Sequence, residues 1–199
     1  MDFDNDGKLD MLTGSYLPGE IYLFRQQKNG EFAAGERLKD WRGNLIQELA
    51  AVPYLADWNG DGKLDLLIGN YYGYVILMLN EGSREKPIFG APEKLQVEGK
   101  RIQVKKDAGP CVADWDQDGK QDLLVGAQDG SVQWYRNVGT NTKPQLAAPI
   151  TLVQLPKGSI RAKVCVVDWN GDGRLDLLVG DCSFPHGWVW LYLRKPKQN

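Results

Sequence analysis

Oxygen-bearing side chains recur at alternate positions in four short stretches of this 199-residue sequence. The stretches read DFDNDGKLDMLTG (2–14), DWNGDGKLDLLIG (57–69), DWDQDGKQDLLVG (114–126) and DWNGDGRLDLLVG (168–180). Positions 1, 3, 5 and 9 of the stretches carry, in order, Asp2, Asp4, Asp6, Asp10; Asp57, Asn59, Asp61, Asp65; Asp114, Asp116, Asp118, Asp122; and Asp168, Asn170, Asp172, Asp176. Because a curled loop can direct every second side chain toward one centre, each stretch predicts a cation-binding loop.

The composition of these loops favours calcium. The glycine at position 6 permits a sharp bend, and the carbonyl at position 7 can add a backbone ligand. The position 7 residues are Lys8, Lys63, Lys120 and Arg174. Oxygen ligands without His or Cys suit a hard cation, and a flexible loop with six or more oxygens favours Ca²⁺ over Mg²⁺. We therefore predict up to four calcium ions, one per stretch.

Two other interpretations of the loops are an EF-hand and a set of Asx-turns. An EF-hand needs an acidic residue at position 12 and flanking helices. Position 12 holds Thr13, Ile68, Val125 or Val179 inside an apparent strand, so the EF-hand interpretation fails. Asx-turns that only terminate strands would explain one such loop, but they explain four loops in one register poorly.

The loops belong to a longer repeat. Their first residues are 55, 57 and 54 positions apart, a period typical of propeller or solenoid arrays. Each loop leads into an apolar strand that ends in Gly, and a second strand rich in aromatic and branched residues follows. A proline-flanked outer strand and a strand before the loop complete the pattern. The sequence thus predicts an all-β fold, a β-propeller or partial propeller of about four four-stranded blades.

We expect one repeat domain over residues 1–199, with repeats at about 1–46, 47–103, 104–158 and 159–199. The first repeat lacks the strand before its loop, and the last lacks the outer strand. Three innermost and three outermost strands are therefore predicted. A larger parent chain, or pairing within or between chains, would complete the missing ends.

The unit DxDxDGxxDLLVG, with a strand before it and a Gly-led turn after it, resembles the FG-GAP or VCBS-type repeat. The resemblance covers essentially the whole chain. It implies a propeller in which each calcium loop joins the first and second strands of a blade, and it implies secretion to an extracellular or periplasmic location. Propellers of this type generally have seven or eight blades.

Charge and composition restrict the partners. The four stretches contain 14 of the 26 acidic residues, so the other 12 face 24 Lys and Arg, a balance that favours an acidic partner. No apolar run is long enough to span a membrane, no signal peptide is visible, and no nucleic-acid motif is present. Three cysteines fit no framework or zinc site, so buried free thiols are expected, with one disulfide plus a free thiol as the alternative.

Several other residues are candidate contact sites. The aromatic residues at position 2 are expected to pack between blades, with sugar stacking as the alternative; they are Phe3, Trp58, Trp115 and Trp169. Tyr71, Tyr72 and Tyr74 are better contact candidates. The basic run 99–106 is either a solvated strand and turn or a docking strip for an acidic polysaccharide. His186 is expected in a surface turn, without a catalytic partner.

The sequence thus favours a non-enzymatic extracellular binding or adhesion scaffold for carbohydrate or protein ligands, with calcium mainly structural. The alternative is a domain of a secreted polysaccharide-degrading enzyme, either a lyase or a hydrolase. A cluster of His, Tyr, Arg or Lys that faces the channel and is not committed to metal would favour that alternative.

Overall fold

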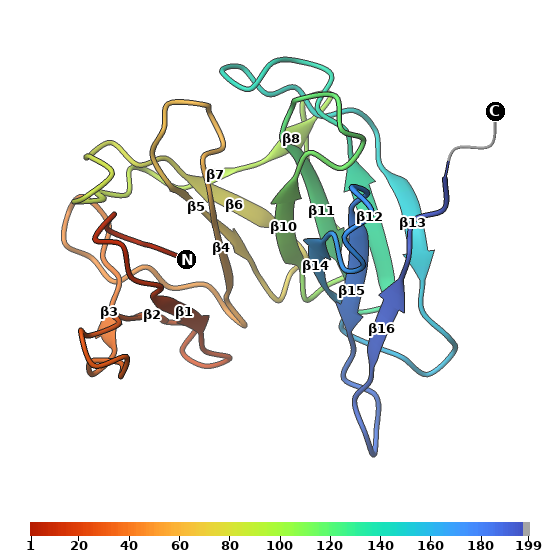
Figure 1. Cartoon of the computed structure of the whole chain (residues 1–199), viewed down its shortest axis with the longest axis horizontal. Helices are drawn as coiled ribbons and strands as arrows, with labels where there is room; N and C mark the ends of the chain where they lie inside the picture. Colours follow the sequence, from red (N-terminus) through yellow and green to blue (C-terminus); the bar gives the residue numbers. More distant parts are fainter. Residues whose placement is uncertain (197–199) are drawn as a thin grey trace.

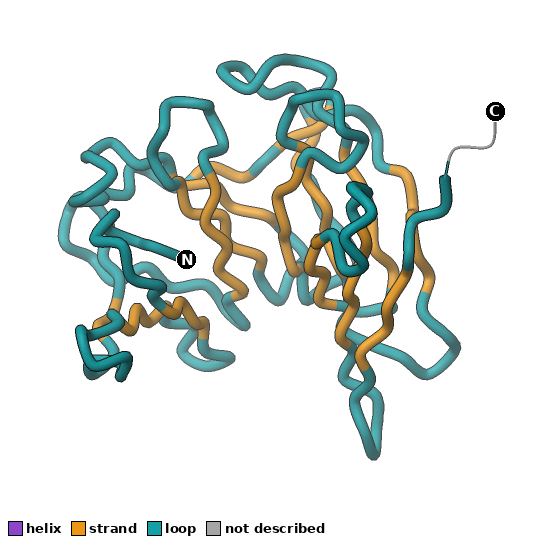
Figure 2. The backbone as a smooth tube through the Cα atoms, in the orientation of Figure 1, coloured by secondary structure: helices purple, strands orange, loops and turns teal. Residues whose placement is uncertain are grey.

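The computed structural model describes residues 1–196. Within these residues the chain forms 16 β-strands and no helix, joined by turns and loops (Figure 2). No helix that could cross a membrane occurs in this described part. The all-β prediction is therefore confirmed.

Four antiparallel sheets follow one another along the chain, and the strands of each sheet pair in sequence order. The first sheet contains β1 (Met11–Gly14), β2 (Ile21–Phe24) and β3 (Glu36–Arg37). The second contains β4 (Val52–Ala56), β5 (Asp65–Gly69), β6 (Val75–Met78) and β7 (Glu93–Lys94). The third contains β10 (Gly109–Ala113), β11 (Asp122–Gly126), β12 (Ser131–Tyr135) and β13 (Ile150–Gln154). The fourth contains β14 (Lys163–Val167), β15 (Asp176–Gly180) and β16 (Val189–Tyr192).

The prediction of four strands per repeat holds only for the two middle sheets. The first sheet has no strand before its acidic loop, and the fourth has no strand beyond β16, in the part of the chain that is described. The three strands that precede an acidic loop (β4, β10, β14) and the three last strands of their sheets (β3, β7, β13) are present, as the repeat pattern predicts. A small extra hairpin, β8 (Gln96–Val97) and β9 (Lys100–Arg101), contains part of the basic run.

The sheets lie side by side in chain order (Figure 1). β4 contacts β1 on one side and β10 on the other, and β10 in turn contacts β14. Residues 1–196 do not close into a ring, because the first and fourth sheets occupy opposite ends of the row.

The hydrophobic core consists of three layers, one between each pair of neighbouring sheets. Alternate residues of a strand point to opposite faces, so a middle sheet contributes to two layers at once. In β5, Leu66 and Ile68 pack toward the first sheet, while Leu67 packs toward the third. This burial on both faces explains why the strands after the acidic loops are continuously apolar.

The position 2 aromatics pack between sheets in three of the four repeats. Phe3, Trp58 and Trp115 are buried, each in the layer between its own sheet and the next. The prediction was wrong for Trp169, which is 58% exposed because no described residue covers the outer face of the fourth sheet. Val189 and Leu191 of β16 are exposed on the same sheet, whereas Trp190 and Tyr192 pack against the layer shared with the third sheet.

A repeated backbone contact fixes the spacing between neighbouring sheets. The glycine that ends the strand after each loop faces the carbonyl of an alanine in the segment leading into the next sheet. The pairs are Gly14 with Ala51, Gly69 with Ala108 and Gly126 with Ala162. In each case an added Cβ would overlap the carbonyl oxygen, so only glycine allows this approach. Gly180, which ends β15, has no neighbour at this position.

Each joint also contains two backbone hydrogen bonds between sheets. In the last joint, Arg161 N donates to Gln128 O and Ala162 N donates to Ala127 O, both at 2.9 Å. Equivalent pairs link Ala50 and Ala51 to Tyr16 and Ser15, and Asp107 and Ala108 to Tyr71 and Asn70. We call this glycine contact and its two hydrogen bonds the sheet joint.

Replacing Gly126 with Ala is expected to lower the free energy of unfolding by about 1–3 kcal/mol, because the new methyl group forces two backbones apart. Gly180→Ala makes the same chemical change where nothing lies within 4 Å of the added carbon, so its effect should stay within about 0.5 kcal/mol. Urea unfolding of both variants measures the difference. Equal losses of unfolding free energy in the two variants would contradict the role assigned to the sheet joint.

Candidate functional site

The acidic loops lie where the sequence placed them. Three of them connect the first and second strands of a sheet: β4 to β5, β10 to β11 and β14 to β15. The remaining loop, the first in the chain at residues 2–10, leads into β1. The connection that the family resemblance implied is thus confirmed for three loops.

The carboxylate at position 1 organises each loop by accepting two backbone hydrogen bonds. In the third loop, Asp114 Oδ1 accepts from Asp118 N at 2.9 Å and Asp114 Oδ2 accepts from Gly119 N at 2.8 Å. Asp2, Asp57 and Asp168 accept the same pair of N–H groups in their own loops. The loop conformation is therefore encoded by its own side chains.

The carboxylate at position 9 ties the loop to the rest of its sheet. Asp65, fully buried at the start of β5, accepts from Trp58 N at 3.0 Å and from Asn80 N at 2.8 Å. Asp10 and Asp176 bridge the same two points, and Asp122 accepts from Asn137 N and the Trp134 indole. Burial raises the pKa of Asp65 and Asp122. The position 9 carboxylate thus holds the loop against its sheet through hydrogen bonds within the protein alone.

Two loops contain a buried oxygen without a partner. Asp4 Oδ1 and Asp116 Oδ1, both at position 3, are buried and accept no hydrogen bond. In these loops the oxygens of Asp2, Asp4 and Asp10, and of Asp114, Asp116 and Asp118, lie within 4.8 Å of one another. Buried polar atoms are normally satisfied, and converging carboxylates suit a hard cation. The residues present therefore fit a calcium ion.

The other two loops satisfy position 3 internally. Their asparagines, Asn59 and Asn170, donate to the carboxylates of Asp61 and Asp172 at 3.3 and 2.9 Å. In the first and third loops an arginine provides the positive partner instead: Arg25 pairs with Asp4, and Arg136 pairs with Asp116 and Asp118. Arg25 also pairs with Glu36.

These differences give all four loops the same formal charge. The position 7 side chain pairs with the position 5 carboxylate in every loop: Lys8 with Asp6, Lys63 with Asp61, Lys120 with Asp118 and Arg174 with Asp172. The first and third loops have four carboxylates and two paired cations, whereas the second and fourth have three carboxylates and one paired cation. When only the loop carboxylates and the side chains paired with them are counted, each loop therefore carries −2, the charge that one divalent cation neutralises.

The arginines were not identified from the sequence, although a signal existed. Arg25 and Arg136 each come directly before the residue whose N–H donates to the position 9 carboxylate. In the second and fourth repeats the residue at this place is a leucine, Leu79 or Leu193. Arginine thus accompanies Asp at position 3, and leucine accompanies Asn.

A second candidate site lies at the opposite end of strands β4, β10 and β14 from the acidic loops. A pocket of about 220 Å³ is lined by residues from all four sheets and their leading segments: Gly14, Ser15, Tyr16, Ala50, Ala51, Val52, Asp107, Arg161 and Lys163. Most of these residues belong to the sheet joints. The sequence analysis did not identify this pocket, because joint residues distant in the chain form it.

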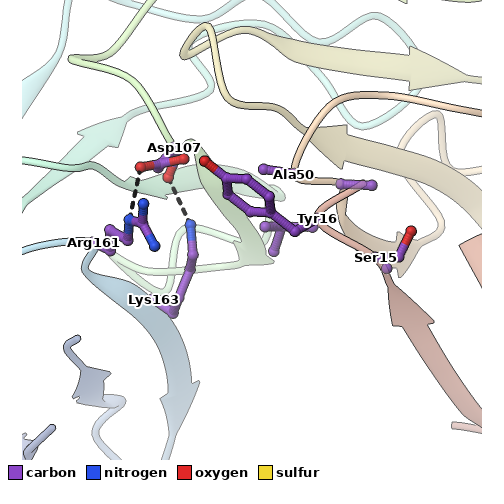
Figure 3. A pocket seen from close by; sticks show the side chains of 9 residues that line it. Ser15, Tyr16, Ala50, Asp107, Arg161 and Lys163 are labelled. Carbon is purple, nitrogen blue, oxygen red and sulfur yellow. Dashed lines mark hydrogen bonds and ion pairs between the residues drawn. The ribbon is translucent and has the colours of Figure 1, made fainter. Parts of the chain in front are cut away.

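The pocket contains two cations and one carboxylate. Arg161 Nε donates to Asp107 Oδ2 at 3.1 Å, and Lys163 Nζ donates to Asp107 O at 2.6 Å. Figure 3 shows both side chains directed at Asp107, with Tyr16 beside them. Burial lowers the pKa of Lys163 to about 8 although Asp107 opposes the shift, and Asp107 raises the pKa of Arg161.

Aromatic rings extend from this pocket across the surface. Tyr16 contacts Tyr71 edge to face at a centroid distance of 6.5 Å, and Tyr71 contacts Tyr72 in the same way at 5.7 Å. The guanidinium of Arg161 lies 5.6 Å from the ring centre of Tyr16, and Lys106 Nζ lies 5.3 Å from that of Tyr71. Tyr16 and Tyr72 are about half exposed, so ring surface remains accessible to a ligand.

The remaining candidates have simpler environments. His186 is exposed in a turn, as expected. All three cysteines are free, but only Cys111 is buried. The expectation of buried thiols was therefore wrong for Cys165 and Cys182, which lie in or next to the fourth sheet, where no described residue covers the outer face.

Comparisons with known proteins give a family match and a distant structural likeness. A family model described as an FG-GAP-like repeat matches residues 2–68 and 114–179. No curated protein matches the sequence. One similar solved structure is described as an Agrocybe aegerita lectin that specifically recognises non-reducing terminal N-acetylglucosamine. The identity is 20% and the TM-score 0.47; the alignment covers 87% of this chain and 43% of that one.

Proposed function

This chain belongs to the family of FG-GAP-like repeat proteins, and from that premise we propose that it is a calcium-binding module that binds ligands outside the cytoplasm without catalysing a reaction. The observation that carries the proposal is the set of four loops in one register, each with a charge of −2. The unpartnered buried oxygens of Asp4 and Asp116 support it further.

The proposed ligands to calcium are the oxygens at positions 1, 3, 5 and 9 of each loop and the carbonyl at position 7. The position 1 and 9 carboxylates already accept two N–H bonds each, but a carboxylate has about four acceptor sites, so both retain capacity for a cation. A bound ion would supply positive charge where the loop has an excess of negative charge.

The sheet order supports an arc of a β-propeller whose first and last blades are incomplete. β4, β10 and β14 are neighbours, as innermost propeller strands are, and each sheet follows its chain neighbour without crossing. A larger parent chain or a second copy would complete such a ring. This arrangement is part of the proposal, since residues 1–196 alone leave the row of sheets open.

Calcium would act mainly as a brace. Extracellular calcium modules bind with Kd near 10⁻⁴–10⁻³ M, and a ligand at about ten times its Kd adds about 1.4 kcal/mol per site. Four independent sites would contribute on the order of 5–6 kcal/mol, which is comparable to the stability of a typical domain.

Calcium is expected to raise the melting temperature by roughly 10–20 °C at about ten times Kd, because 1 kcal/mol corresponds to about 2–4 °C in a chain of this size. Scanning calorimetry in millimolar calcium and in excess chelator measures the shift. Magnesium at the same concentration is the control. Identical melting curves in calcium and chelator would contradict the calcium proposal.

Replacing Arg136 with Leu is expected to tighten calcium binding by the third loop about tenfold. A unit charge and a double charge about 6 Å apart in water interact by about 1.4 kcal/mol, which is a factor of about ten in Kd. The amide signal of Gly119 in a calcium titration followed by NMR reports this loop, and that of Gly173 reports the fourth loop as an internal control.

The double variant Asp116→Asn/Arg136→Leu gives the third loop the residue pair found in the second and fourth loops. Its charge returns to −2, so its affinity should return to near the wild-type value. A single variant that binds no more tightly than wild type would contradict the role of charge.

Carbohydrate or protein is the proposed partner class. Electrophoresis through gels containing acidic or neutral polysaccharides, with calcium and with chelator, tests the carbohydrate class. We expect one class of polysaccharide to retard the protein in calcium but not in chelator. Uniform mobility of folded protein would exclude a polysaccharide ligand and leave protein partners.

The pocket cluster gives one specific observation in favour of a second function. Tyr16, Arg161 and Lys163 are not committed to the acidic loops and lie where the innermost strands of a propeller would face its channel, as a domain of a polysaccharide-degrading enzyme would require. Release of reducing ends, or of unsaturated products absorbing in the ultraviolet, from the polysaccharides above would establish this alternative.

A further inference from the structure

We propose that the pocket at the sheet joints binds the carboxylate of an acidic saccharide, with the sugar ring placed against Tyr16. This inference rests on the proposed binding function and deepens it by naming a site and a ligand class. The acidic loops lie at the other ends of β4, β10 and β14. Each of these strands has five residues, so it separates the pocket from the nearest acidic loop by about 16 Å. The two sites are therefore separate.

The charge of the pocket favours an anion. Arg161 and Lys163 face a single carboxylate, Asp107, whose side chain is 5% exposed. Asp107 interacts with Arg161 through its carboxylate but with Lys163 through its backbone carbonyl. The Lys163 ammonium has three donors and the residue is half-buried, so an unbalanced positive charge remains beside the cavity. A buried charge is costly unless it is paired.

The sheet joint itself does not need these cations. At the position of Lys163, the two preceding joints carry Val52 and Gly109, and at the position of Arg161 they carry Ala50 and Asp107. All three joints nevertheless form the same backbone hydrogen bonds. Their leading residues share a positive φ of 47–58°, so this backbone conformation belongs to the joint. The backbone of the last joint therefore does not depend on Arg161 and Lys163, and their bonds to Asp107 leave donors available for a ligand.

The surroundings favour a saccharide over a bare anion. The pocket is smaller than the roughly 300–1,000 Å³ typical of sites for drug-sized ligands, so it suits one small group attached to a larger molecule. The exposed ring of Tyr16 adjoins the cations, and an aromatic face with a polar tip packs well against the C–H groups of a sugar. Tyr71, Tyr72 and Lys106 continue the surface for further sugar units.

The first test compares glucuronate with glucose by isothermal titration calorimetry on the full chain in calcium. The two sugars differ only at C6, which is a carboxylate in glucuronate and a hydroxymethyl group in glucose, so glucuronate is expected to bind at least tenfold more tightly. Acetate should bind at least tenfold more weakly than glucuronate, because it lacks the ring. Equal affinities for glucuronate and glucose, or for glucuronate and acetate, would overturn the proposal.

Substitutions locate the site. Lys163→Met is expected to weaken glucuronate binding at least tenfold, while Lys157→Met, at an exposed lysine in the preceding turn, leaves it unchanged.

Asp107→Asn removes the competing carboxylate and should tighten glucuronate binding several-fold, a result that a purely structural ion pair would not give. Tyr16→Ala, at a half-exposed side chain, tests the ring independently if Lys163→Met fails to fold. Wild-type binding by either Lys163→Met or Tyr16→Ala would overturn the assignment.

Calcium-dependent melting of the same samples separates the two proposals. A calcium shift without glucuronate binding would overturn the pocket and leave the calcium module intact. Glucuronate binding without a calcium shift would support the pocket and overturn the calcium part of the proposed function.

Discussion

The sheet joint is the contact on which the rest of this structure depends. A glycine without a side chain lets the carbonyl of the next sheet's leading segment approach closely, and two backbone hydrogen bonds hold the approach in place. This contact sets the distance between sheets, so it determines how the apolar residues of β5 and β11 fill the layers on both faces. It also brings Asp107 and Arg161, 54 residues apart in the chain, within hydrogen-bonding distance.

Each of the strands β4, β10 and β14 separates two regions with different constraints. At its end, the acidic loop repeats almost the same side chains in every sheet, because those side chains make the hydrogen bonds that shape the loop. At its start, the joint is made by backbone groups, so the side chains there can vary. Ala50, Asp107 and Arg161 occupy one equivalent position yet differ in size and charge. Repetition therefore suits a structural ion, and variation suits a single ligand.

Much of this organisation could be predicted from the sequence, because it depends on local patterns. The acidic loops, the strands that follow them and the incomplete first and last sheets all follow from residue spacing. The pocket could not be predicted, since its lining comes from four sheets and no local motif marks it. Trp169 has the same local pattern as Trp58, but its exposure depends on a neighbouring sheet that the described chain does not provide. Local sequence encodes the repeat, whereas burial at its ends depends on what adjoins it.

The acidic loops reach one charge by two routes, and this agreement is hard to explain by turn formation alone. Turn formation uses the position 1 and 9 carboxylates, which every loop has. The asparagines at position 3 add one bond, from the position 5 N–H to Asn59 Oδ1 or Asn170 Oδ1, but the loops with Asp at position 3 form the same position 1 hydrogen bonds without it. Yet Asp occurs there only with an arginine at Arg25 or Arg136, and Asn only with a leucine at the corresponding place. An extra carboxylate and an extra cation leave the shape of the loop unchanged but keep its net charge at −2. A requirement on charge rather than on shape connects these two distant positions, and a divalent cation held in every loop would impose that requirement.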